Sequence, residues 1–146
     1  MEITQMQMND YQGVYDLWIS TPGMGLNDID DSFEGIQAYL KRNPTTCFVA
    51  KENDCIYGVI LSGHDGRRGY IHHTAVAISK RKQGIGKALV EHALYALKEE
   101  GISKVALVAF KRNEIGNAFW ENLGFNVRED LNYRNLALVS LKRIDT

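Results

Sequence analysis

The stretch YIHHTAVAISKRKQGIGKALVEHALYALK, residues 70–98, decides the fold. Its first part is an apolar, β-branched run that is typical of a buried strand. A basic turn with Gly84 and Gly86 follows, and apolar residues then recur at spacings of three and four, which predicts a helix with one apolar face. Gly101 is the expected end of that helix. The stretch therefore predicts a strand, a glycine turn and a helix in succession.

A helix that begins at such a turn is suited to holding an anion. The first helical N–H groups have no acceptor within the helix, and the helix dipole adds partial positive charge there. Lys80, Arg81, Lys82 and Lys87 surround the same helix start. We therefore expect the turn to bind phosphate.

The glycine spacing narrows the kind of phosphate ligand. Gly84-Ile85-Gly86-Lys87 lacks the GxxxxGK[ST] spacing of a Walker loop, and Leu89 stands where GxGxxG needs its last glycine. What remains is R-x-x-G-x-G from Arg81 to Gly86, with Val76 eight residues before Gly84. A turn of this kind can also be a plain connection between a strand and a helix.

Composition predicts an ordinary globular domain over residues 1–146, large enough to fold without disulfides or a metal. The formal net charge of −1 argues against nucleic acid or an anionic membrane as the main partner. No apolar run has the length of a membrane span, and MEITQMQMND lacks the features of a signal peptide. A cytoplasmic location with Cys47 and Cys55 as reduced, buried thiols is the resulting expectation.

The whole chain predicts a mixed α/β (α+β) fold in the order β-α-α-β-β-β-α-β-α-β-β. About seven strands are expected, at residues 1–8, 47–51, 55–62, 70–79, 104–110, 125–128 and 134–142. About four helices are expected: one after Asn9 or Asp10 with Val14, Leu17 and Trp18 on one face, one capped by Ser32, one at 85–98 and one capped by Asn113.

A second motif supports a family resemblance. Residues 113–125, NEIGNAFWENLGF, resemble the signature N-x-x-x-x-A-x-[YF]-x-x-x-G-F of the GNAT superfamily of acyl-CoA-dependent N-acetyltransferases, with Trp120 at the aromatic position. The turn from Arg81 to Gly86 resembles the pyrophosphate loop of the same superfamily, and the order of elements agrees along essentially the whole chain. The resemblance implies a GNAT-like, mostly antiparallel sheet and acetyl-CoA as the acyl donor, with no metal.

The resemblance also implies where coenzyme A would lie. The strand before the turn would splay from the strand after the long helix, and pantetheine would pair with backbone in that gap. An N–H near Val76 would polarise the thioester carbonyl. Lys82 replaces a glycine often found at its position, which matters if that position needs a positive φ. The implied cofactor-binding residues are Ala75, Val76, Ile78, Arg81, Lys82, Gln83, Gly84, Ile85, Gly86, Lys87, Asn113, Phe119 and Trp120.

Acyl transfer to an amine also needs proton transfer. Family members often have a tyrosine acid where this chain has Trp120, whose indole cannot serve as an acid. Tyr133 and Tyr95 are candidates to replace that tyrosine as the acid, and the leaving thiolate of coenzyme A can also take its proton from water. His72 and His73 are the best bases; as strand neighbours they are expected on opposite faces, with His72 beside Tyr70, Thr74 and Val76 slightly preferred. Alternatively, one histidine packs in the core and the other bonds a neighbour.

The sequence defines the binding site of the amine acceptor less clearly than that of the acyl donor. Asp28, Asp30 and Asp31, with Glu34, can attract a cationic amine, or they can be a solvated loop that caps the next helix. The favoured hypothesis is N-acetyltransfer to a primary amine of a small molecule or peptide by direct attack. The alternatives are a non-catalytic acyl-CoA-binding module or sensor, and a nucleotide-binding protein. The final run NLALVSLKR can pair with a second copy, so a homodimer is possible.

Overall fold

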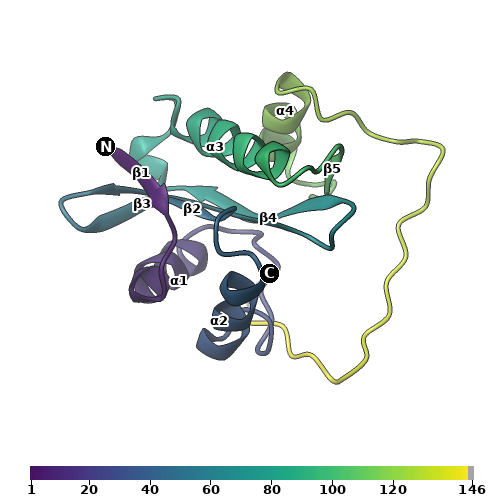
Figure 1. Cartoon of the computed structure of the whole chain (residues 1–146), viewed down its shortest axis with the longest axis horizontal. Coiled ribbons are helices and arrows are strands. Elements are labelled where there is room, and N and C mark those ends of the chain that lie inside the picture. Colours follow the sequence, from purple (N-terminus) through teal and green to yellow (C-terminus); the bar gives the residue numbers. More distant parts are fainter. Residues whose placement is uncertain (145–146) are drawn as a thin grey trace.

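The structure is a computed structural model that describes residues 1–144. Its core is one five-stranded sheet in which the spatial order follows the chain order (Figure 1). The strands are β1 (Glu2–Gln5), β2 (Phe48–Glu52), β3 (Cys55–His64), β4 (Gly69–Val76) and β5 (Val105–Leu107). Neighbouring strands are antiparallel from β1 to β4, and β5 joins β4 in parallel.

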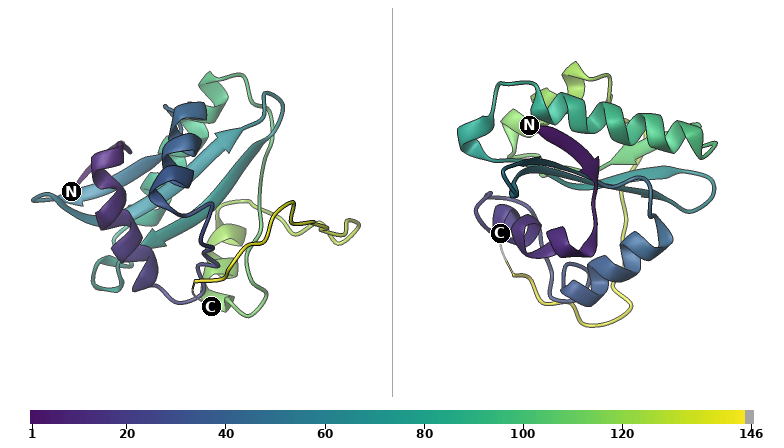
Figure 2. Two further views of the ribbon diagram at one scale, coloured as in Figure 1. Left: turned by 90° about the horizontal axis from the view of Figure 1, so that it is seen from below. Right: turned by 60° about the vertical axis from the view of Figure 1, so that its left-hand side comes forward.

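Four α-helices cover the two faces of this sheet. Helices α1 (Tyr11–Ile19) and α2 (Phe33–Arg42) lie on one face, and α3 (Ile85–Glu99) and α4 (Glu114–Asn122) lie on the other (Figures 1 and 2). Two short 3₁₀ helices, η1 (Met8–Asp10) and η2 (Ile78–Lys80), connect the elements. The mixed α+β fold and its four helices are confirmed.

The number of strands is a correction. The sequence predicts about seven, and residues 1–144 form five. Residues 125–128 and 134–142 form no strand: no neighbouring strand pairs with them, and the chain bends at residues 138 and 139. The strand expected at 104–110 is paired only over Val105–Leu107, and Ala106 within it is exposed.

Alternating side chains divide the core into two clusters, one on each face of the sheet. Val49 of β2 packs with Val14 and Trp18 of α1, whereas its neighbours Phe48 and Ala50 pack under α3. The apolar face of α3 is buried as predicted, through Ile85, Leu89, Ala93 and Leu97 at successive turns. The sheet thus holds the two helical layers at fixed positions.

Local capping follows the predictions at two helices and differs at a third. Ser32 accepts a hydrogen bond from the amide of Gly35 at the start of α2, and Asn113 does the same from Gly116 at α4. Asp10 precedes α1 without capping it. Its carboxylate instead accepts the amide hydrogen of Gln7 and pairs with Lys51 Nζ at 2.7 Å.

The two cysteines have different surroundings, contrary to the expectation that both are buried. Cys47 is buried and its Sγ lies 3.2 Å from the carbonyl of Ser62. Burial raises the pKa of the Cys47 thiol to about 12, so this thiol is unreactive near neutrality. Cys55 is exposed because it stands at the start of β3, beside the turn at Asn53 and Asp54.

None of the helices in residues 1–144 is long and apolar enough to cross a membrane.

The packing of α3 on the sheet generates a stability prediction. Leu89 is 0% exposed, and Leu89→Ala should lower the free energy of unfolding by about 3 kcal/mol, because it removes buried methyl groups and leaves a cavity. Tyr95→Ala is the matched control, since Tyr95 lies on the same helix and is 69% exposed. Urea unfolding at one protein concentration measures both. Equal losses in the two variants would contradict the assigned α3 interface.

Candidate active site

A bulge in β4 shapes the candidate site. Leu61 of β3 pairs with His72 and Val59 pairs with Ala75, so β4 has one residue more than β3 between these two pairs. His73 lies in the bulge with φ at +42°, a left-handed conformation that L-residues rarely adopt. The extra residue changes which face of the sheet the following side chains meet.

The bulge corrects the predicted orientation of the two histidines. Both rings lie on the α1–α2 face: the ring of His72 is 5.8 Å from that of Tyr39 on α2, and the ring of His73 is 5.2 Å from that of Trp18 on α1. Tyr70 stacks 4.5 Å from His72, as expected for two residues on one face. Val76 packs in the cluster under α3, so it does not share the face of His72.

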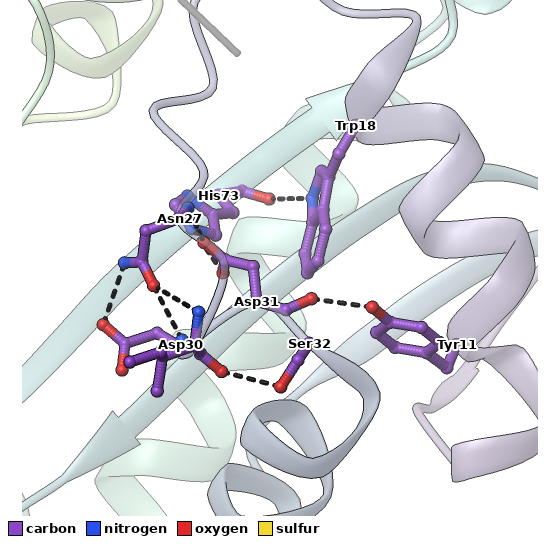
Figure 3. A network of polar contacts seen from close by, with 8 residues as sticks. Tyr11, Trp18, Asn27, Asp30, Asp31, Ser32 and His73 are labelled. Carbon is purple, nitrogen blue, oxygen red and sulfur yellow. Dashed lines mark hydrogen bonds and ion pairs between the residues drawn. The ribbon is translucent and has the colours of Figure 1, made fainter. Parts of the chain in front are cut away.

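Two residues from the α1–α2 side, Trp18 and Asp31, hold His73 in this conformation (Figure 3). The indole of Trp18 donates to the carbonyl of His73 at 3.0 Å, and His73 Nε2 lies 2.9 Å from Asp31 Oδ1. Asp31 is 3% exposed; its second oxygen accepts the amide hydrogen of Asn27, and Tyr11 donates to its carbonyl. These bonds offset a backbone cost of about 1–2 kcal/mol for the left-handed residue.

The ring of His72 is tied less firmly. The residue is exposed, and no hydrogen bond engages its ring within residues 1–144. Partial burial of the imidazole between Tyr39 and Tyr70 lowers the pKa of His72, and the neighbouring His73 lowers it further. Asp31 and Asp30 oppose this shift. The net lowering keeps the ring neutral at pH 7, with a free lone pair for a proton.

Strands β4 and β5 separate directly after Ile71. Their parallel pairing runs from Gly69 and Val105 to Ile71 and Leu107, and β4 then continues to Val76 without pairing to β5. We call residues 72–76 and 108–110 the splay. No strand pairs across the splay, so an extended ligand can pair with backbone there, although the carbonyls of His73, Val76 and Phe110 already accept hydrogen bonds from elsewhere in the chain.

The glycine turn follows the splay and is open to solvent. Residues 81–84 are all exposed, and α3 begins behind them with Ile85 buried. Lys82 has φ at +60° and Gly84 has φ at +81°, so the position where the family often has glycine does need a left-handed residue. Arg81 Nε donates to the carbonyl of Val76 at 3.1 Å, which folds this basic side chain back over the end of β4.

Helix α4 closes the other side of the helix start. A Cβ atom at Gly86 would lie only 3.1 Å from the ring of Phe119, so glycine permits α4 to approach α3. The Phe119 ring contacts Trp120, which in turn contacts Phe125. Asn113 is used as the cap of α4 rather than being free for a ligand.

The remaining predicted cofactor residues fall into two kinds. The side chain of Ala75 is buried in the α1–α2 cluster, so only its backbone can meet a ligand. Ile78, Gln83 and Lys87 are exposed around the turn.

The three acidic residues of the loop before α2 have separate roles. Asp31 is the buried partner of His73. Asp30 is exposed and accepts from the side chain of Asn27. Asp28 binds the end of the chain: its carboxylate accepts the amide hydrogen of Lys142, and its amide donates to the Lys142 carbonyl. The expectation of a solvated capping loop holds for Ser32 but not for Asp31.

The same loop reaches both sides of the splay. Asp31 binds His73 on β4, while a Cβ atom at Gly25 would contact the ring of Phe110 at 3.5 Å. The loop therefore lies across the α1–α2 side of the splay.

The two tyrosines offered as acids are both exposed. Tyr95 lines a groove over α3 with Phe48 and His92. Tyr133 lies in the extended chain after α4, and its charge contributes to a raised pKa of Tyr70, for which burial is the larger cause. Tyr133 is therefore near the ring that stacks on His72.

The bulge and the Trp18–His73–Asp31 contacts were missed from the sequence. The sequence pattern places Trp18 on the apolar face of the first helix and Asp31 in an acceptor-binding or capping loop, and no spacing rule connects either residue to His73. Among residues 1–144 there is no group of three or more His, Cys, Asp or Glu side chains placed to hold a metal ion.

The fold is shared with solved acetyltransferases. The model of the Acetyltransferase (GNAT) family matches residues 11–125, and the chain therefore belongs to that family.

Known acetyltransferases are similar to this chain over most of its length. An acetyltransferase of Pectobacterium atrosepticum is 28% identical over 125 residues, which are 86% of this chain and 87% of the relative. The structure of a predicted acetyltransferase with acetyl-CoA from Clostridium acetobutylicum has a TM-score of 0.74 at 19% identity, covering 92% of this chain and 95% of that one. An aminoglycoside acetyltransferase from an uncultured soil metagenomic sample, in complex with sisomicin, has a TM-score of 0.72 at 22% identity, covering 94% and 96%.

The anchoring of the bulge is tested by two aspartates of one loop. Asp31→Ala should lower the free energy of unfolding by about 2–3 kcal/mol, because it leaves the Asn27 amide and the His73 ring without their acceptor. Asp30→Ala, at an exposed neighbour, should have little effect. Denaturant unfolding measures both changes. A stability of Asp31→Ala equal to that of Asp30→Ala would contradict the anchoring role.

Proposed function

We propose that this acetyltransferase moves an acetyl group from acetyl-CoA to a primary amine of a small molecule or peptide, by direct attack in a ternary complex. One observation carries the proposal: β4 parts from β5 immediately before an exposed, basic glycine turn that opens α3. An extended thiol arm can pair with the parted strand while its diphosphate meets the helix start. We further propose that residues 1–146 act as one such domain.

The donor side of the proposed complex depends mainly on backbone. The amide of Ala77 already donates to the carbonyl of Tyr57, so the amide of Val76 is the proposed donor to the thioester carbonyl and the developing oxyanion. The first-turn amides of Ile85, Gly86 and Lys87 lack acceptors within α3 and would receive the pyrophosphate. In the complex, Arg81 exchanges its bond with Val76 for a phosphate oxygen.

His72 is the proposed general base. It lies at the first position of β4 that is not paired with β5, on the face of the acidic loop, and its lowered pKa keeps it neutral at physiological pH. A neutral imidazole can take the proton that the amine loses on attack. Asp28 and Asp30 lie on the exposed part of that loop and would attract a cationic amine. The buried Asp31 instead orients His73.

The leaving thiolate takes its proton from Tyr133 or from water. Tyr133 is the proposed donor because its phenol is electrostatically coupled to Tyr70, which stacks on His72. Trp120, at the position where the family often has tyrosine, packs between Phe119 and Phe125 and carries no acidic proton. Relatives bound to acetyl-CoA or to an aminoglycoside support both halves of this proposal by analogy of fold.

Turnover is tested with a panel of primary amines. Acetyl-CoA with a suitable amine should release free thiol faster than acetyl-CoA alone, and mass spectrometry should find the amine heavier by one acetyl group. Coenzyme A binding in calorimetry without turnover on any amine would favour a binding module instead. Stronger binding of ATP or NAD than of coenzyme A would favour a nucleotide site.

The basic turn generates a binding prediction. Arg81→Gln should weaken coenzyme A binding about tenfold, because it removes a charged hydrogen-bond donor beside the pyrophosphate. Arg67→Gln is the control: it removes the same charge in the exposed turn before β4 and should leave the Kd unchanged. Isothermal titration calorimetry measures both. Equal weakening by the two changes would mean that only net charge matters, against a built phosphate site.

The role of His72 has its own kinetic test. His72→Gln should lower kcat at least a hundredfold at pH 7.5 with little change in coenzyme A affinity, because it removes the base and leaves the donor side intact. Protonated His72 cannot accept the amine proton, so the ratio of wild-type to variant rates should fall as the pH is lowered. Because the pKa of His72 is lowered, this fall should occur only below a pH of about 6.5.

His92→Gln, an exposed histidine of α3, is the control and should keep full activity. A wild-type to variant ratio for His72→Gln that does not change with pH would exclude His72 as the base.

A further inference from the structure

The backbone of Val76 presents one donor and one acceptor to the splay. The amide of the next residue, Ala77, donates to the carbonyl of Tyr57 at 2.8 Å, so Ala77 faces β3. Backbone groups of successive strand residues point to opposite edges, and the N–H and C=O of Val76 therefore point away from β3. Both groups lie where an extended ligand would pair with the end of β4.

The side chain of Arg81 occupies this acceptor. Its Nε donates to the carbonyl of Val76 at 3.1 Å, across a separation of 5 residues in the sequence. The guanidinium therefore lies on the outward side of β4, which is the side that a strand-like ligand needs. An amide N–H of such a ligand has to displace Arg81 before it can reach the same oxygen.

The backbone that carries Arg81 is fixed, whereas its side chain can move. The preceding residue, Lys80, ends η2, and its Nζ lies 3.0 Å from Glu52 Oε2 and 4.9 Å from the centre of the Tyr57 ring. These contacts tie η2 to β2 and β3. Arg81 itself is exposed. Its guanidinium can therefore exchange one acceptor for another while the turn keeps its position.

A diphosphate at the glycine turn is the stronger of the two acceptors. Arg81 begins the exposed turn of residues 81–84, directly before the first amides of α3. A phosphate oxygen carries negative charge, and a charge-assisted bond between it and a guanidinium is stronger than a bond to a neutral carbonyl. A diphosphate bound at the turn would thus draw Arg81 away from Val76 and release the carbonyl of β4.

We propose that Arg81 couples the two halves of the acyl donor, because diphosphate binding at the turn frees the Val76 carbonyl for an amide of the pantetheine arm. This inference rests on the proposed use of acetyl-CoA as the donor. A thioester without a diphosphate has to displace Arg81 while offering it no new partner, so the site selects against short thioesters. The coupling is reciprocal: an arm bound at Val76 favours diphosphate binding by the same factor.

The coupling predicts opposite effects of one substitution on two ligands. Arg81→Ala should weaken the binding of coenzyme A about tenfold, because the variant loses a charged contact to phosphate. The same change should strengthen the binding of pantetheine, which is the arm alone, about fivefold, because the Val76 carbonyl is already free. Calorimetry of the full chain measures coenzyme A, and NMR titration of ¹⁵N-labelled protein measures pantetheine.

Lys87→Ala is the matched control. Lys87 is exposed in the first turn of α3, so its loss removes the same charge from the same helix start. It should weaken coenzyme A and leave pantetheine unchanged. Pantetheine binding that Arg81→Ala leaves unchanged or weakens, or that Lys87→Ala strengthens equally, would overturn the coupling while the donor site stands. Failure of the wild-type protein to bind coenzyme A would overturn the proposed function, and the coupling with it.

Inorganic pyrophosphate supplies the diphosphate separately from the arm. At saturation it should raise the affinity of the wild-type protein for pantetheine about fivefold, because it holds Arg81 away from Val76. It should not change the affinity of Arg81→Ala for pantetheine. Sodium chloride at the same ionic strength is the control for screening and should have no effect on either protein. No increase in the wild-type protein, or an equal increase in both proteins, would overturn the coupling.

Discussion

The bulge at His73 is the constraint on which the site depends. One additional residue in β4 turns two consecutive histidines toward α1 and α2 and ends the regular pairing geometry where β5 departs. The strained residue persists because Trp18 binds its carbonyl and the buried Asp31 binds its ring. The core packing of α1 and the polar loop before α2 therefore act together on one backbone position.

The two faces of the sheet supply different parts of the chemistry. On the α3 face, packing of Leu89 and its neighbours fixes the helix start, and Gly86 lets Phe119 approach it. On the α1–α2 face, the rings of Tyr39 and Tyr70 partly bury His72, and this partial burial lowers its pKa. The splay joins the two faces, because the ligand that we propose to pair with β4 there would have its diphosphate end at α3 and its reactive end beside His72.

Much of this arrangement could be predicted from the sequence, and the limits have physical causes. Periodicity located the helices, the first four strands and the glycine turn, because each depends on local patterns such as the spacing from Ile85 to Leu97. The orientation of His73 could not be predicted, since period-two alternation assumes an uninterrupted strand and the bulge has no local signal. The last two strands were predicted from the apolar pattern at Leu136 and Leu138, but a strand also needs a paired neighbour, and these segments are not paired with the β5 edge of the sheet.

The donor and acceptor sides differ in how their specificity is encoded. The proposed donor side uses backbone amides, a left-handed conformation at Gly84 and close packing at Gly86, which tolerate few sequences and therefore leave a motif. The acceptor side is one loop whose contacts reach β4 through Asp31, the chain after β5 through Gly25, and the end of the chain through Asp28. Such a loop can change its exposed residues while these three contacts keep its position. Acceptor preference can thus vary among proteins with this fold while the donor motif is kept.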